Sequence, residues 1–188
     1  GLFRPDENAD DTGFSETIRS VAEAAGTLAL TKTGALMVIL RRTKLGEVVS
    51  TGTPIDSRIS PQILENLFFP KSPLHDGAVI IDANRVVAAG CYLPLTDDIS
   101  LSKELGTRHR AGIGISETAD CVVVIVSEET GKISLALNGN LTRNLSEESL
   151  EKWLEKLLAP QVAKTIPGQK IRYHRFFSRT SRYYIYHN

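Results

Sequence analysis

The stretch Cys121-Val122-Val123-Val124-Ile125-Val126 is an uninterrupted run of apolar, mostly β-branched residues. Such a run predicts a strand that is buried on both of its faces. It turns through Ser127–Gly131 into a second apolar segment, Ile133–Leu137. Ala35–Leu40 is another short, almost wholly apolar run and predicts a third buried strand. These segments indicate a buried sheet at the centre of the domain.

Segments with helical periodicity lie before and after these strands. Between Phe14 and Leu30, apolar residues recur at the spacing of a helix with one buried face. Ser60 followed by Pro61 predicts a helix start, because serine caps a first turn and proline fits the first helical position. We expect Pro70 to end that helix and Ser146 to open the last one. The apolar stripe of the last helix comprises Leu150, Trp153, Leu154, Leu157 and Leu158, before Pro160.

The arrangement of these segments defines the fold class. Ala78–Ile81 and Val86–Tyr92 read as two strands joined by a turn at residues 82–85. Strands and helices therefore interleave, and adjacent strands are often linked by short turns. This predicts an α/β (mixed α+β) domain: a central, mostly buried mixed β-sheet flanked by helices in a single globular domain. The pattern does not give the order of the strands.

Composition limits the class of protein. The chain has 188 residues, 41% of them hydrophobic, which suits one folded domain with a substantial core. No apolar run reaches the roughly 20 residues of a membrane helix. Cys91 and Cys121 lie in apolar runs and are expected to be buried free thiols rather than metal ligands. We expect a polar leader over residues 1–13, the domain over 14–160 and a tail over 161–188.

The first candidate site residues precede a predicted strand. In Leu74–Ala78, Asp76 supplies a carboxylate and Gly77 permits close approach by a ligand or by the backbone. The alternative is an ordinary Asp-Gly turn that leads into the strand. The polar pair Glu128 and Glu129, at the end of another strand, could hold a divalent metal against phosphates, or could belong to a plain hairpin turn.

A basic stretch, Gly106–Arg110, is the second candidate. Thr107 is expected to cap a short helix, so that two arginines and a histidine crowd the positive end of the helix dipole. A bound anion would offset this repulsion, since backbone amides and guanidinium groups both favour phosphate. The alternative is a solvated basic turn. Elsewhere, Tyr92 and Leu93 could form an apolar wall for a base or simply pack in the core.

The candidate stretches belong to four motifs that follow one another along the chain. They are Pro73–Ala78, Cys91–Leu95, Lys103–Arg110 and Val126–Gly131, in which Asp76-Gly77-Ala78 and Arg108-His109-Arg110 stand out. Together they resemble the diadenylate cyclase domain over about Phe14–Pro160, and most of all the membrane-anchored cyclic di-AMP synthases.

The resemblance implies a function and a set of roles. Two ATP molecules would condense into cyclic di-AMP with release of two pyrophosphates. Asp76 would orient or deprotonate the ribose 3′-hydroxyl, and Gly77 and Ala78 would let the nucleotide lie against the backbone. The implied triphosphate ligands are Thr107, Arg108, His109, Arg110 and Ser127, supported by Glu128 and Glu129. Tyr92 and Leu93 would face adenine. The implied ligands of Mg²⁺ or Mn²⁺ are His75, Asp76 and Glu129.

The resemblance also implies partners and location. A homodimer, whether stable or transient, would place two ATP sites face to face, and regulatory protein partners are compatible with it. The core domain would bind no nucleic acid. Transmembrane helices that precede such domains are absent from this sequence, so we expect a cytoplasmic domain tethered to the membrane in a longer protein. A non-catalytic nucleotide sensor is the alternative function.

The C-terminal tail falls outside the resemblance. Six of the 22 Lys and Arg residues lie between Ala159 and Asn188, where there is no Asp or Glu. Aromatic residues alternate with these cations, which is compatible with binding to nucleic acid or to an anionic membrane surface. Packing of the tail on its own domain is the other interpretation. The rest of the chain is net acidic, so a polyphosphate site in it must gather its cations locally.

Overall fold

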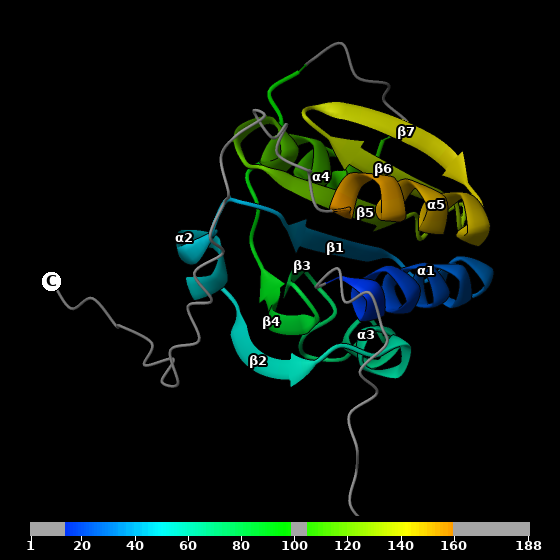
Figure 1. Cartoon of the computed structure of the whole chain (residues 1–188), viewed down its shortest axis with the longest axis horizontal. Helices are drawn as coiled ribbons and strands as arrows, with labels where there is room; N and C mark the ends of the chain where they lie inside the picture. The colour runs from blue at the N-terminus through cyan, green and yellow to red at the C-terminus, as the bar shows by residue number, and fades with distance from the viewer. Residues whose placement is uncertain (1–13, 99–104, 160–188) are drawn as a thin grey trace, which may run out of the picture.

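The computed structural model describes residues 14–98 and 105–159, and within them seven strands form one sheet. The strand order is β2-β4-β3-β1-β5-β6-β7, as Figure 1 shows. The strands are β1 (Ala35–Leu40), β2 (Thr53–Arg58), β3 (Ala78–Asp82), β4 (Arg85–Cys91), β5 (Cys121–Val126), β6 (Ile133–Leu137) and β7 (Asn140–Leu145). The helices are α1 (Ser15–Leu30), α2 (Gly46–Ser50), α3 (Pro61–Leu67), α4 (Thr107–Thr118) and α5 (Glu147–Leu158).

The sheet is mixed, with its only parallel pairing between described strands at the centre. There β1 runs parallel to β3, with Met37 opposite Val79, and antiparallel to β5, with Ala35 opposite Val126. Every residue of β1 and of β5 is buried, which confirms the interpretation of both apolar runs as strands covered on two faces. The predicted mixed sheet flanked by helices is therefore confirmed.

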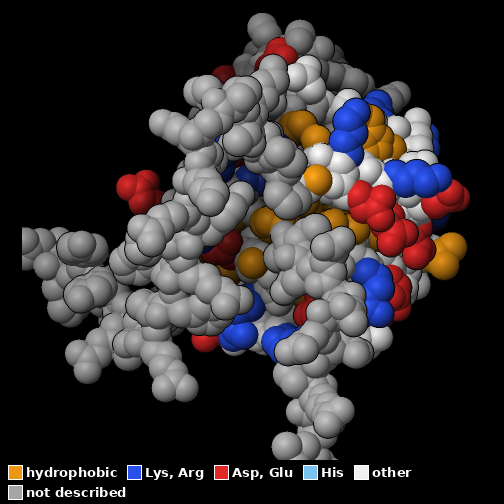
Figure 2. All heavy atoms as spheres, viewed as in Figure 1, with side chains coloured by type: hydrophobic (Ala, Val, Ile, Leu, Met, Phe, Trp, Pro, Cys, Tyr) orange, Lys and Arg blue, Asp and Glu red, His pale blue; other side chains and the backbone are white. Residues whose placement is uncertain are grey.

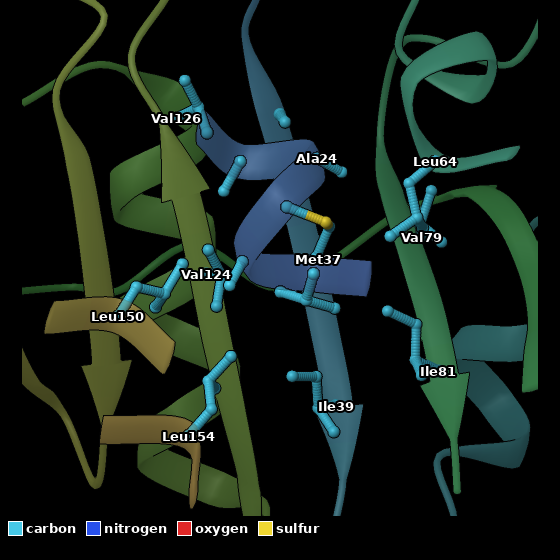
Figure 3. Packing of buried hydrophobic residues seen from close by; sticks show 14 of the residues in the cluster. Ala24, Met37, Ile39, Leu64, Val79, Ile81, Val124, Val126, Leu150 and Leu154 are labelled. Atoms are coloured by element: carbon cyan, nitrogen blue, oxygen red, sulfur yellow. The ribbon is translucent and has the colours of Figure 1, made fainter. Parts of the chain in front are cut away.

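Helices cover the two faces of the sheet. On one face α1 packs against α3 and α5, and alternate residues of the central strands meet these helices. Figure 3 shows this core, in which Met37 and Ile39 of β1 lie beside Val124 of β5, with Leu150 and Leu154 of α5 nearby. On the other face α4 packs against β5, β6 and β1, while α2 contacts β4 and β2. Side chains of the opposite parity, such as Leu36 and Val38, fill that second core.

Helix starts follow partly from local sequence. The Ser60 hydroxyl accepts a hydrogen bond from the Ile63 amide at 3.2 Å, with Pro61 in the first turn, as predicted. Ser146 caps α5 in the same way. By contrast, α1 has no local side-chain cap; the Asn84 side chain from the β3–β4 turn accepts the Thr17 amide at 3.0 Å. The cap of α1 is therefore a tertiary contact.

Some elements were not expected from the sequence. The short helix α2 and the edge strands β2 and β7 carry no buried residue, so they lack a strong hydrophobic pattern. In α5 the buried residues are Leu150, Leu154 and Leu158, whereas Trp153 is 38% exposed and carries the Lys156 ammonium over its ring. Trp153 has the spacing of the apolar stripe, but it does not join the buried part of it.

Where Figure 2 shows described side chains, acidic and basic groups lie beside one another. Across the described residues no helix is long and apolar enough to cross a membrane. The predicted leader (1–13) and the whole of the predicted tail (161–188) lie outside the described residues, as do residues 99–104. Both cysteines are buried and unpaired, as expected.

Candidate functional site

A cavity of about 580 Å³ lies at one end of the central strands. Because β1 and β3 run parallel while β4 and β5 run the other way, the starts of the first pair and the ends of the second meet at this end. The first turn of α4 closes the same region. The wall consists of Leu36, His75, Asp76, Gly77, Cys91, Tyr92, Leu93, Leu95, Gly106, Thr107, Arg108, His109, Ala111, Val126, Ser127, Glu128 and Glu129. All four motifs of the sequence thus contribute to one cavity.

The segment before β3 places a carboxylate and an imidazole at the wall. Asp76 is exposed and His75 is half-buried. The Nδ1 atom of His75 lies 2.6 Å from the Ser72 carbonyl oxygen, which can only accept, so Nδ1 carries the proton. In the neutral ring the lone pair is then on Nε2, the arrangement that a metal-binding histidine needs.

Gly77 is required by the backbone itself. Its φ is +102°, a conformation that side chains disfavour. A Cβ atom at this position would lie 2.8 Å from the Cys91 carbonyl oxygen and 2.8 Å from the Gly90 carbonyl carbon, both of them main-chain atoms. The close approach of β4 is therefore sufficient to explain this glycine, although Gly77 also lines the cavity.

The first turn of α4 presents its amides and Arg108 at the cavity. The N-cap residue is Gly106, which supplies no side-chain hydrogen bond, and Thr107 is the first helical residue. The prediction that Thr107 caps a short helix was therefore wrong in both respects, because the helix has 12 residues. A helix start without a side-chain cap keeps amide donors and the positive end of its dipole available to an anion.

Arg108 is held by one partner and leaves one donor unused. Its Nη1 atom forms an ion pair with Oε2 of Glu128 at 2.7 Å. Its Nε atom is buried and has no hydrogen-bond partner among the described residues. The Arg108 side chain is 21% exposed and that of Glu128 63%. The guanidinium is thus largely shielded, which strengthens its interaction with any anion that reaches it.

His109 does not add a cation to this group. Its side chain is buried, and burial, together with the positive charge of Arg143, lowers its pKa below the ordinary value of 6.5, while Glu129 opposes this. The imidazole is therefore neutral at pH 7. Two arginines, not two arginines and a charged histidine, carry the positive charge of the first turn.

Part of the cavity wall is apolar. Leu36 of β1 and Leu93 line it, with Tyr92 at the rim, where it is 71% exposed. The Tyr92 amide donates to the Thr51 hydroxyl at 2.9 Å, and that hydroxyl donates to the Val48 carbonyl oxygen at 2.6 Å. The turn after α2 therefore fixes the backbone of this wall. Burial raises the pKa of the Cys91 thiol to about 11, so it lines the cavity as a neutral group.

Two predicted site residues do not reach the cavity. Ala78 is completely buried within β3. Arg110 is half-buried outside the wall, and its carbonyl oxygen accepts from the Thr96 amide. The predicted metal ligands His75, Asp76 and Glu129 all line the cavity, yet no three His, Cys, Asp or Glu side chains of the described segments come close enough together to hold a metal ion by themselves.

The sequence did not point to Leu36 or Ala111 as cavity residues, and it gave Gly106 and Val126 no role beyond membership of a motif. Leu36 and Val126 lie within the apolar runs themselves, so no polar residue singles them out. They reach the cavity because β1 and β5 are neighbours and Ala35 pairs with Val126. That pairing depends on strand order, which the pattern did not give.

Comparison with known proteins adds independent information. The family model described as "DAC: DisA bacterial checkpoint controller nucleotide-binding" matches residues 22–141. The chain is 49% identical over 140 residues to the cyclic di-AMP synthase CdaA of Bacillus subtilis, covering 74% of this chain and 51% of that protein. It is also 49% identical over 147 residues to a diadenylate cyclase of Listeria monocytogenes, covering 78% and 54%. The chain thus spans about half the length of these curated relatives.

Solved structures share the fold. A double mutant of DacA from Staphylococcus aureus superposes with a TM-score of 0.73 at 47% identity, covering 75% of this chain and 94% of that one. A protein from Bacillus cereus described as a hypothetical membrane spanning protein gives a TM-score of 0.68 at 42% identity, covering 70% and 65%.

Proposed function

Because this chain belongs to the DAC family of DisA-type nucleotide-binding domains, we propose that it is the catalytic domain of a diadenylate cyclase. It would condense two ATP molecules into cyclic di-AMP and release two pyrophosphates. One observation carries the proposal: a single cavity joins the Asp76 carboxylate, before β3, to the Arg108 guanidinium, at the start of α4. The names of relatives at 49% identity support the same reaction.

The cavity suits one nucleotide. Its volume of about 580 Å³ lies within the usual range of small-ligand sites. Adenine would lie against the apolar wall of Leu36 and Leu93, with Tyr92 covering it from the rim. The triphosphate would lie along the first turn of α4, where Arg108, Thr107 and Ser127 offer donors. In this arrangement phosphate oxygens would take up the unused Nε donor of Arg108.

The chemistry requires two such domains. In each transfer a ribose 3′-oxygen forms a bond to the α-phosphorus of the other ATP, and the bond from that phosphorus to the bridging oxygen of pyrophosphate breaks in line. The hydroxyl proton leaves through Asp76 or a water that it orients. Two domains placed face to face hold both nucleotides in this geometry, so that the reaction becomes effectively intramolecular. We therefore propose that a homodimer is the active form.

A divalent cation, Mg²⁺ or Mn²⁺, fits the donor set. When bound, it would neutralise phosphate charge and polarise the α-phosphate. His75, Asp76 and Glu129 are the protein groups that would hold it. Since these groups do not form a closed cluster, the substrate's own phosphate oxygens would have to complete the coordination, as Mg²⁺ sites commonly require. The lone pair on His75 Nε2 is compatible with this role.

For location, we propose that the domain is cytoplasmic and tethered to a membrane by a part of the protein outside this chain. The description of the Bacillus cereus neighbour as membrane spanning supports this. The basic tail lies outside the described residues, and binding of nucleic acid or of a membrane through it stays a prediction.

The test is a product assay. Purified protein is incubated with ATP and Mg²⁺ or Mn²⁺ over a series of protein concentrations, and the nucleotides are separated by chromatography. We expect cyclic di-AMP, with a rate that grows more steeply than linearly with protein concentration. Asp76→Asn should bind ATP but form no product. If the unmodified protein binds ATP but forms no product at any protein concentration and with either metal, it is instead a nucleotide sensor.

A further inference from the structure

Gly34 lies beside Arg108 in a way that the motifs of the sequence do not reveal. It follows α1 and immediately precedes β1. A Cβ atom on Gly34 would lie 2.6 Å from Nη1, 2.7 Å from Cζ and 3.1 Å from Nε of Arg108. The first two distances are shorter than real Cβ atoms show, and the third is tighter than most Cβ contacts. The guanidinium therefore lies directly on the main chain at Gly34.

This glycine is not needed for its backbone conformation. The described glycines with positive φ are Gly77, Gly90, Gly131 and Gly139, and Gly34 is not among them. Any residue could adopt its main-chain geometry. A side chain at residue 34 is excluded because Arg108 already occupies the space that it would need.

The backbone around Gly34 is held on both sides. The Thr33 amide donates to the Leu28 carbonyl oxygen at 2.8 Å, and Ala35 is paired with Val126 in the centre of the sheet. Arg108, in contrast, contacts Gly34 only through its guanidinium, which is the far end of a flexible side chain. If a methyl group is added at residue 34, the guanidinium must move rather than the strand.

We propose that Gly34 is a positioning residue. Its missing side chain leaves a slot between the Gly34 main chain and Glu128, and from this slot the Arg108 guanidinium faces the nucleotide phosphates. This inference rests on the proposed function, because it assigns Arg108 to the phosphates of ATP. The slot fixes the plane of the guanidinium between the Gly34 main chain and the Glu128 carboxylate. A planar donor group delivers paired hydrogen bonds only from a fixed orientation. A displaced guanidinium loses that alignment without losing its charge.

Gly34→Ala tests the proposal, with Gly46→Ala as the matched control. Gly46 has no atom within 4 Å of an added Cβ atom. ATP affinity is measured by titration calorimetry, with the unfolding midpoint and the KM and kcat of the cyclase reaction. We expect Gly34→Ala to weaken ATP binding about tenfold, the size of one charge-assisted hydrogen bond. KM should rise with it, and the midpoint should change little. Gly46→Ala should leave ATP affinity at the level of the unmodified protein.

A double-mutant cycle with Arg108→Ala separates positioning from packing. If Gly34 acts through Arg108, then Gly34→Ala has no further effect on ATP affinity once Arg108 is alanine. Additive losses would overturn the proposal, as would unchanged affinity in Gly34→Ala. If Gly34→Ala alone unfolds the protein, the pair with Arg108→Ala decides: recovery of the fold supports the slot, and continued unfolding refutes it. Failure of the unmodified protein to bind ATP would refute the proposed function, and the positioning role with it.

Discussion

Arg108 and Glu128 form an ion pair of 2.7 Å in the wall of the cavity, although they are 20 residues apart on α4 and on the turn after β5. The carboxylate occupies a donor that the proposed phosphates would use. An incoming polyphosphate must therefore compete with Glu128 or share the guanidinium with it. Glu128 is therefore an anion already bound to Arg108, where the proposed phosphates would also bind.

Replacement of Glu128 by glutamine should therefore tighten ATP binding when no divalent cation is present. Because the carboxylate is 63% exposed, its attraction to Arg108 is modest, and we expect a gain of about two- to fivefold in affinity. Titration calorimetry in the presence of a chelator measures it. Glu47→Gln, on α2, is a control for the change in net charge. Weaker binding by Glu128→Gln would mean that Glu128 supports the nucleotide directly.

The contact between Thr51 and Tyr92 leads to a second prediction. Thr51→Val keeps the shape of the side chain but removes the acceptor of the Tyr92 amide and the donor to the Val48 carbonyl oxygen. Water can replace these bonds at the surface, so the midpoint of unfolding should fall only slightly. The apolar wall should lose its fixed position, and we expect KM for ATP to rise about two- to fivefold while kcat is retained. Steady-state kinetics tests this, with Thr53→Val on β2 for comparison.

Gly77→Ala should damage the fold rather than ATP contacts alone. The positive φ and the two main-chain atoms at 2.8 Å leave no place for a methyl group. We expect a loss of about 2 kcal/mol or more in the free energy of unfolding, from strain and from separation of β3 and β4. Chemical denaturation measures it against Gly46→Ala. Near-native stability with lost activity would show that Gly77 serves the nucleotide and that the strand contact is tolerant.

The sequence predicted the elements that have strong local signals. The fully apolar β1 and β5 and the serine caps of α3 and α5 need no tertiary information. The cap of α1 could not be found, because its acceptor comes from Asn84, 67 residues away. Trp153 has the helical spacing of the apolar stripe but is exposed, because only Leu150, Leu154 and Leu158 of α5 are buried.

For the site, the polar residues could be predicted but their geometry could not. The motifs placed Asp76 and Arg108 at the ends of elements, and both do line the cavity. The helix capped by Gly106 puts Arg110 outside the wall, because successive residues of a helix point in different directions. Gly34 carries no signal in the sequence, since its importance arises only when β1 and α4 are brought together.

The lowered pKa of His109 predicts a loss of stability in mild acid. The unfolded chain binds a proton at the ordinary value of 6.5, while the buried imidazole of the folded protein resists it. The unfolded state then holds more protons, so the free energy of unfolding falls as the pH drops below 6.5. His109→Gln removes this titration, and its stability should depend less steeply on pH between 7 and 5.5. Denaturation at several pH values measures the slopes, and His75→Gln is the control that retains His109. Equal slopes in the unmodified protein and in His109→Gln would show that His109 takes up its proton as readily when folded.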